Sequence, residues 1–112
     1  MIGLRGALIV IDVNMTVLLD IYGELLTEKQ RVSMELFYNN DYTLAEIGED
    51  LNISRQGVHE NIKQGTDKIK KFESILKINE KSIKLKKECE KLKKQIDNEE
   101  AFMQIDLIKN IL

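Results

Sequence analysis

Hydrophobic residues recur every three or four positions along most of this chain, which is the spacing of one face of an α-helix. Thr27 and Gln30 fit a capping box, in which each side chain bonds a backbone amide at the start of a helix. We therefore predict one helix before Thr27 and a second after it. Their inward positions are Met15, Leu18, Leu19, Tyr22, Leu25 and Leu26 in the first, and Val32, Leu36 and Phe37 in the second.

The stretch from Thr43 to Ile62 predicts two further helices joined by a tight turn. Thr43 and Glu46 fit another capping box, so the first of these helices should start at Leu44. Gly48 is unfavourable inside a helix, and a close crossing by the following helix would explain it. The inward face of this helix is predicted to hold Leu44, Ile47 and Leu51.

Asn52 marks the end of that helix, because asparagine tolerates the left-handed backbone found at many helix ends. Ile53 supplies an apolar anchor in the turn, and Ser54 is a favourable N-cap for the next helix. That helix should point Val58 and Ile62 inward. Its outward face would then carry Arg55, Gln56, His59, Glu60 and Lys63.

This pattern is typical of a DNA-binding helix-turn-helix, whose second helix enters the major groove. Arg55 suits a bidentate contact to guanine and Gln56 one to adenine. Thr43, Ser54 and Lys63 suit phosphate oxygens. A purely structural pair of amphipathic helices is the alternative interpretation, in which Gln56 and His59 are ordinary surface residues.

Beyond Ile62, the apolar residues Ile69, Phe72 and Leu76 are predicted to close a four-helix head over residues 15–72. Residues 73–112 form a C-terminal helical extension with a heptad pattern, which indicates a possible coiled coil and a homodimer. The apolar tail could instead fold back as a short helix after Asn98. The heptad positions are Ile75, Ile78, Ser82, Leu85, Cys89, Leu92, Ile96, Glu99 and Met103.

Residues 1–14 differ in character from the rest, with an unbroken apolar run from Ala7 to Ile11. Arg5 is a weak basic start for a secretory signal. We expect an upstream extension, with Met15 as the natural beginning. This segment should be disordered or form a helical lead-in packed on the core.

The composition supports long helices and an aliphatic core, since proline is absent and aromatic residues make up only 5%. The net charge of −2 and the pI of about 5.5 argue against a generic polybasic nucleic-acid binder. The charge is unevenly distributed: residues 41–50 carry four acids and no base. Residues 54–72 carry five bases against two acids, so the positive charge gathers on the proposed recognition helix.

Cys89 is the only cysteine and His59 the only histidine, which excludes a Cys/His zinc cluster and an intramolecular disulfide. A single reduced cysteine fits a cytoplasmic protein. No apolar stretch reaches the length of a membrane span. The sequence holds no activated nucleophile, paired carboxylates or phosphate-binding glycine loop, so we expect neither an enzyme nor a cofactor.

The stretch LLDIYGELLTEKQRVSMELFYNNDYTLAEIGEDLNISRQGVHENIK, residues 18–63, resembles the YlxM family of small bacterial proteins. Its signatures are LLTEKQ, the aromatic-Asn-Asp linker and ISRQGVHENIK. The head is also similar to the fourth region of bacterial sigma factors. The resemblance implies an all-α fold with a helix-turn-helix of the winged-helix-like superfamily, without a wing.

By this resemblance the chain would be a DNA-binding regulator of transcription, with double-stranded DNA as its partner. Family genes commonly neighbour those of the signal recognition particle and its receptor, which implies a role in that secretion pathway. By motif, Ser54, Arg55, Gln56, His59 and Lys63 would form the recognition surface. This chain has His59 where relatives often carry tyrosine. The alternative is a protein- or ribonucleoprotein-interaction module of the secretion pathway that does not read DNA.

Overall fold

A computed structural model describes residues 15–112, and every element in that range is helical. The expectation for residues 1–14 lies outside the described residues. The chain divides into two compact units, one ending at Leu76 and the other spanning Lys77–Leu112. None of the described helices combines the length and the apolar composition that a membrane-spanning helix needs.

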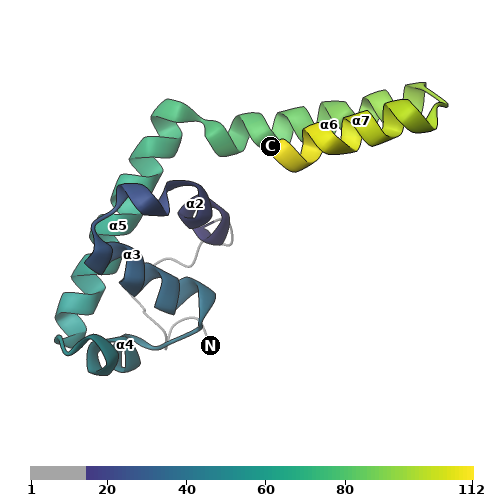
Figure 1. Ribbon diagram of the computed structural model, residues 1–112. Helices are drawn as coiled ribbons and strands as arrows, with labels where there is room; N and C mark the ends of the chain where they lie inside the picture. The colour runs from purple at the N-terminus through teal and green to yellow at the C-terminus, as the bar shows by residue number, and fades with distance from the viewer. Residues whose placement is uncertain (1–14) are drawn as a thin grey trace. The chain divides into compact units, whose positions relative to one another are not determined.

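The first unit, which we call the head, packs short elements against one long helix (Figure 1). The long helix is α5 (Arg55–Leu76), and it contacts every other α-helix of the head. The short elements are α2 (Met15–Tyr22), the 3₁₀ turn η1 (Gly23–Leu25), α3 (Glu28–Met34), the π-helical turn η2 (Glu35–Asn39) and α4 (Leu44–Leu51).

Both predicted capping boxes are confirmed. Thr27 Oγ1 accepts from the amide of Gln30, and the amide of Thr27 donates to Gln30 Oε1, each at 3.2 Å. In the same way, Thr43 Oγ1 accepts from the amide of Glu46 at 3.1 Å, and Glu46 Oε1 accepts from the amide of Thr43 at 2.9 Å. These four bonds satisfy amides that the helix itself leaves without partners, and they fix where α3 and α4 begin.

The core of the head is aliphatic with two aromatic rings, as the composition indicated. Leu25 and Leu76, both predicted to face inward, are 58% and 44% exposed. α2 ends at Tyr22, so Leu25 falls in the 3₁₀ turn and leaves the inward face. The buried hydrophobic residues are Met15, Leu18, Leu19, Tyr22, Leu26, Met34, Phe37, Leu44, Ile47, Val58, Ile62 and Ile69.

The inward positions predicted for the helix after Thr27 are partly confirmed. Phe37 is fully buried, and Leu36 is half-buried against the core. Val32 is only half-buried, whereas Ser33 and Met34, which were not predicted, are fully buried. Met34 lies against Gly65 of α5, where an added Cβ would come within 2.4 Å of the Met34 sulfur. Small size at Gly65 therefore lets α3 approach α5 closely.

Polar contacts also join α5 to the shorter helices. The Tyr22 hydroxyl donates to Glu73 Oε1 at 2.6 Å. Gln30 Nε2 donates to Gln64 Oε1 at 3.3 Å, and Lys68 Nζ donates to Gln30 Oε1 at 3.1 Å. α2 and α3 are thus attached to α5 by buried apolar contacts and by hydrogen bonds at the edge of the core.

The second unit is a helical hairpin of α6 (Ile78–Gln95) and α7 (Glu99–Ile111), which lie side by side (Figure 1). Lys77, with φ 55°, interrupts the helix before α6. Asn98 Oδ1 accepts from the amide of Ala101 at 3.1 Å and so caps α7. Of the two arrangements predicted for the tail, the structure has the fold-back after Asn98, and the heptad pattern is not carried by one continuous helix.

Candidate nucleic-acid interface

The turn between α4 and α5 is built by backbone bonds that fix its length. Asn52 adopts the predicted left-handed conformation, with φ 56° and ψ 46°. The amide of Ile53 donates to the Gly48 carbonyl at 2.9 Å, which closes the end of α4. A Cβ on Gly48 would lie 2.8 Å from the carbonyl oxygen of Ile53. The close approach expected at Gly48 is therefore made by the turn backbone, rather than by the following helix.

The start of α5 is fixed just as firmly. Ser54 Oγ accepts from the amide of Gly57 at 2.9 Å, and the Ser54 carbonyl accepts from the amide of Val58 at 3.0 Å. Val58 and Ile62 are fully buried, as predicted. Because these two residues hold one side of α5 in the core, the opposite side of its first two turns must face outward.

Arg55, Gln56 and Lys63 are brought together on these exposed first turns of α5. Gln56 and Lys63 are seven residues apart and so lie on the same side of the helix. Within the described part of the chain, no hydrogen bond or ion pair engages these three side chains. They can therefore donate to a ligand without breaking an internal contact.

Thr43 and Ser54 stand at the two N-caps of the motif, at opposite ends of α4. Their hydroxyl oxygens accept backbone amides. Each hydroxyl still has its hydrogen, which could donate to a phosphate oxygen. The cap bond would then orient the hydroxyl for that contact.

His59 lies apart from the freely exposed residues. Its side chain is half-buried, and its Nε2 atom is buried with no hydrogen-bond partner in the described structure. One residue after Val58, it lies about 100° from the buried side of α5, on the flank of the helix. The prediction that His59 lies on the outward face of α5 is therefore only partly right.

The charges around this surface are mixed. Glu60 lies on the same outward side and accepts from Gln64 Nε2 at 3.0 Å. Lys68 donates to Gln30, so one of the five counted bases is used inside the head. The backbone amide of Thr43 lowers the pKa of Glu46 by bonding its carboxylate. This carboxylate stays charged at neutral pH and keeps α4 acidic, together with the exposed Glu49 and Asp50.

Sequence reasoning missed two features that support the surface. One is the set of contacts from Gln30 to Gln64 and Lys68, which join residues more than thirty positions apart and leave no local signal. The other is the π-helical turn η2, where Tyr42 N bonds the Leu36 carbonyl at 3.0 Å before α4 begins. In residues 15–112 there is no group of three or more His, Cys, Asp or Glu side chains placed to hold a metal ion.

The sequence matches a protein family described as "Putative helix-turn-helix protein, YlxM / p13 like", also named UPF0122, over residues 10–111. This match extends well beyond the stretch of residues 18–63 on which the resemblance was based. Since it includes the hairpin, the C-terminal unit is also similar to the family.

Individual relatives match mainly over the head. A UPF0122 protein of Acetivibrio thermocellus is 54% identical over 59 residues, which cover 53% of this chain and 50% of the relative. A UPF0122 protein of Staphylococcus haemolyticus is 48% identical over 68 residues, covering 61% and 62%. One of Clostridium kluyveri is 56% identical over 52 residues, covering 46% and 47%. The chain thus spans about half the length of most of these relatives.

Proposed function

Because this chain belongs to the UPF0122 (YlxM / p13 like) family of helix-turn-helix proteins, we propose that it is a cytoplasmic regulator of transcription that binds double-stranded DNA as a homodimer. The observation that carries this proposal is the exposed side of the first three turns of α5, where Arg55, Gln56 and Lys63 have no partner among the described residues. A helix N-terminus presented in this way is what enters the major groove in helix-turn-helix proteins.

The six candidate residues have different roles in this proposal. Arg55 and Gln56 read base edges, since both side chains can make bidentate bonds. Thr43, Ser54 and Lys63 contact phosphate oxygens and set the position of α5 on the duplex. His59, half-buried on the flank of α5, makes an edge contact at most.

Glu60 and the acidic residues of α4 should keep the affinity of a single head modest, because they repel the phosphate backbone. A homodimer held by the C-terminal helices compensates by placing two heads on one DNA. In a symmetric dimer the two half-sites would lie about one helical turn apart, or a multiple of it.

The test is binding of the full-length chain to genomic DNA fragments at physiological salt. We expect a preferred fragment, and we expect Arg55→Ala with Gln56→Ala to weaken binding to it at least about 10-fold. Lys87→Ala, an exposed residue of α6, is the matched control and should leave the preference unchanged. Equal binding to all fragments, unaltered by the double substitution, would contradict sequence-specific recognition.

The second candidate is a protein- or ribonucleoprotein-interaction module that takes part in the signal recognition particle pathway. It is favoured by the exposed acids Glu49 and Asp50 on α4, next to the proposed recognition helix. It predicts recovery of the particle's protein or RNA from lysate by the tagged chain, with little dependence on salt. Failure to recover either component would count against it.

A further inference from the structure

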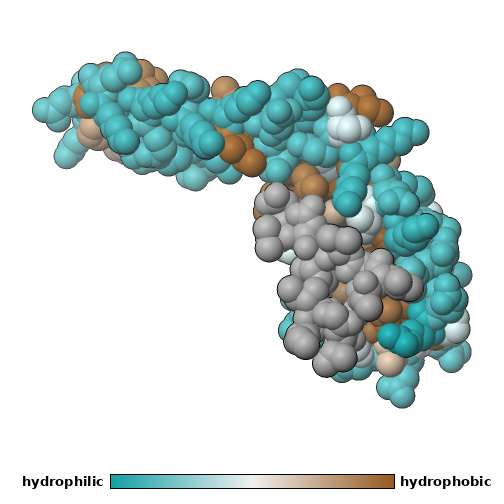
Figure 2. Space-filling model, turned by 180° about the vertical axis from the view of Figure 1, so that it is seen from behind, coloured by the Kyte–Doolittle hydropathy of each residue, from teal (hydrophilic) through white to brown (hydrophobic). Residues whose placement is uncertain are grey.

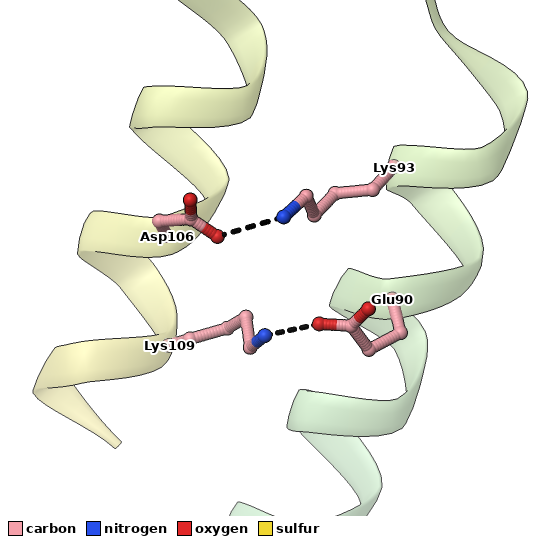
Figure 3. A network of polar contacts seen from close by, with 4 residues as sticks. All are labelled: Glu90, Lys93, Asp106 and Lys109. Atoms are coloured by element: carbon pink, nitrogen blue, oxygen red, sulfur yellow. Dashed lines mark hydrogen bonds and ion pairs between the residues drawn. The ribbon is translucent and has the colours of Figure 1, made fainter.

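The α6–α7 hairpin has one side closed by ion pairs. Lys93 Nζ lies 3.1 Å from Asp106 Oδ1, and Lys109 Nζ pairs with Glu90 Oε1 (Figure 3). Lys93 also lies 5.7 Å from the centre of the Phe102 ring. These contacts connect the two helices and cover the edge between them on that side.

The other side of the hairpin is apolar. On α6, Leu85 and Leu92 are seven residues apart and share one side, and Leu92 lies two residues, about 200°, beyond Glu90. On α7, Ile108 comes two residues after Asp106, and Ile111 two residues after Lys109, again about 200° away. We call Leu85, Leu92, Ile108 and Ile111 the apolar strip.

The apolar strip is left largely open to solvent. Leu85 and Leu92 are 49% and 48% exposed, and Ile108 and Ile111 are 45% and 85% exposed. Ile105, 5% exposed, is the one buried residue of the described hairpin. Figure 2 shows apolar atoms emerging through the otherwise hydrophilic surface of this unit. Ile83, Met103 and Leu107 are also exposed but lie outside the strip. The strip differs from them because it continues from one helix to the other, and an exposed apolar surface of this kind is suited to contact a partner.

The charges indicate which partner fits. Seven lysines and three glutamates give α6 a formal charge of +4, whereas three acids and one lysine give α7 a charge of −2. A second copy placed with its α7 over this α6 brings two helices of opposite net charge together. The net charges are the same when the four ion-paired residues Glu90, Lys93, Asp106 and Lys109 are left out, +4 for α6 and −2 for α7. Placing α6 on α6 would bring like charges together, which is unfavourable.

We propose that the apolar strip binds the same strip of a second copy of this chain, with α6 of each copy packed on α7 of the other. The result is a four-helix bundle with two-fold symmetry, in which the ion-pair sides face solvent. This inference rests on the homodimer of the proposed function and specifies the surface that makes it.

Sedimentation of the full-length chain, without DNA, tests the proposal over a hundredfold range of concentration. We expect twice the 13.0 kDa mass of one chain. Leu85→Glu with Leu92→Glu should raise the dimer dissociation constant at least about 100-fold, because each leucine loses its burial and each carboxylate resists desolvation. Both leucines are half-exposed within one chain, so the variant should keep its helix content by circular dichroism.

Ile83→Glu is the matched control. Ile83 lies on α6 two residues before Leu85, about 200° round the helix, and is 46% exposed. It should leave the dissociation constant within about threefold of the unsubstituted chain. Glu100→Lys, at the edge of the strip on α7, should weaken the dimer at low salt and lose this effect at high salt.

A mass of 13.0 kDa at every concentration would overturn the proposal, as would a dimer that survives Leu85→Glu with Leu92→Glu. If Ile83→Glu weakened the dimer as much as Leu85→Glu with Leu92→Glu, the dimer surface would not be the apolar strip. A monomer that sediments with lipid vesicles would assign the strip to a membrane surface instead. If the unsubstituted chain dimerises but prefers no DNA fragment, the proposed function is contradicted and the dimer surface is not.

Discussion

At the scale of single residues, the helix-turn-helix depends on two kinds of position. Gly48 is needed because the turn backbone passes within 2.8 Å of where its Cβ would be. Thr43 and Ser54 are needed because their hydroxyls satisfy the first amides of the two helices. The first kind excludes a side chain, and the second requires a particular one. Substitutions at each kind should therefore fail in different ways.

Gly48→Ala should destabilise the protein by about 1–3 kcal/mol, since the steric overlap with Ile53 outweighs the helix preference of alanine. Equilibrium unfolding in urea measures the change. Gly23→Ala is the control, because its added Cβ would meet no atom of the described structure closer than 3.5 Å. An equally stable Gly48→Ala protein would show that the turn can move away.

Glu46 should make the stability of the head depend on acid pH. Its pKa is lowered from 4.5 by the hydrogen bond from the Thr43 amide. The lowered pKa means that this contribution is complete above pH 4.5 and is lost as the pH falls through the lower folded-state value. Unfolding of the unsubstituted chain and of Glu46→Gln, compared between pH 7 and pH 3, should show a difference that shrinks in acid. Glu49→Gln is the control for removing one charge from α4.

At the scale of elements, the sequence predicted those helices whose ends carry a local chemical signal. The starts of α3, α4 and α5 follow from Thr27, Thr43 and Ser54, and the end of α4 follows from Asn52. The start of α6 could not be found in this way, since Lys77 adopts a left-handed backbone that lysine rarely takes. The π-helical turn η2, in which Phe37 is fully buried, also has no sequence signal.

The candidate site was predictable to the same degree. Arg55, Gln56 and Lys63 lie outward because Val58 and Ile62 set the phase of α5, which helical spacing alone reveals. Helical spacing predicted His59 to lie further outward than it does. The width of the buried side of α5 depends on the neighbouring elements, which the spacing does not describe. The use of Lys68 by Gln30 depends on a contact between α3 and α5 that no local pattern contains.

The ion pair of Glu90 on α6 with Lys109 on α7 should stabilise the hairpin over a defined pH range. The hydrogen bond from Lys109 lowers the pKa of Glu90 below 4.5, and the same bond raises the pKa of Lys109 above 10.5. The contribution of the pair is therefore complete between these two values. It is lost as the pH falls through the folded-state pKa of Glu90, or rises through that of Lys109.

Thermal unfolding, followed by helix content, checks this range. It compares the unsubstituted chain with the double variant Glu90→Gln plus Lys109→Gln. The difference should be largest near neutral pH and should decrease in strong acid and strong base. Because the pair is exposed, it should also decrease with added salt. A difference that stays constant from pH 3 to pH 11 would show that packing, not charge, holds the two helices together.

At the scale of the whole molecule, the two units divide the work that we propose. In this proposal the head, which ends at Leu76, contacts DNA, and the hairpin of Lys77–Leu112 binds a second copy. Two modest contacts made by linked heads bind much more tightly than one, because the second binding event becomes intramolecular. Affinity for DNA should therefore depend on residues that never touch it.

Truncation after Leu76 tests this division. The shortened chain should keep its preference for a single half-site but lose at least about 100-fold in affinity for a site with two halves. Fluorescence anisotropy with one-half and two-half duplexes measures both values. Equal affinities of the full and shortened chains for the two-half duplex would show that the hairpin contributes nothing to DNA binding.

The turn between α4 and α5 has a consequence for which changes of chain length the protein can tolerate. The amides of Asn52 and Ile53 donate to the carbonyls of Glu49 and Gly48, and the Ser54 carbonyl accepts from the amide of Val58. Each of these hydrogen bonds requires a fixed number of residues between its partners. Surface loops usually accept insertions, but one extra residue here would separate the bonds that close α4 from the Ser54 cap that opens α5. α5 would then shift relative to α4, and Val58 could no longer keep its place in the core. Among functional members of the family, this turn should keep its length even where its residues change.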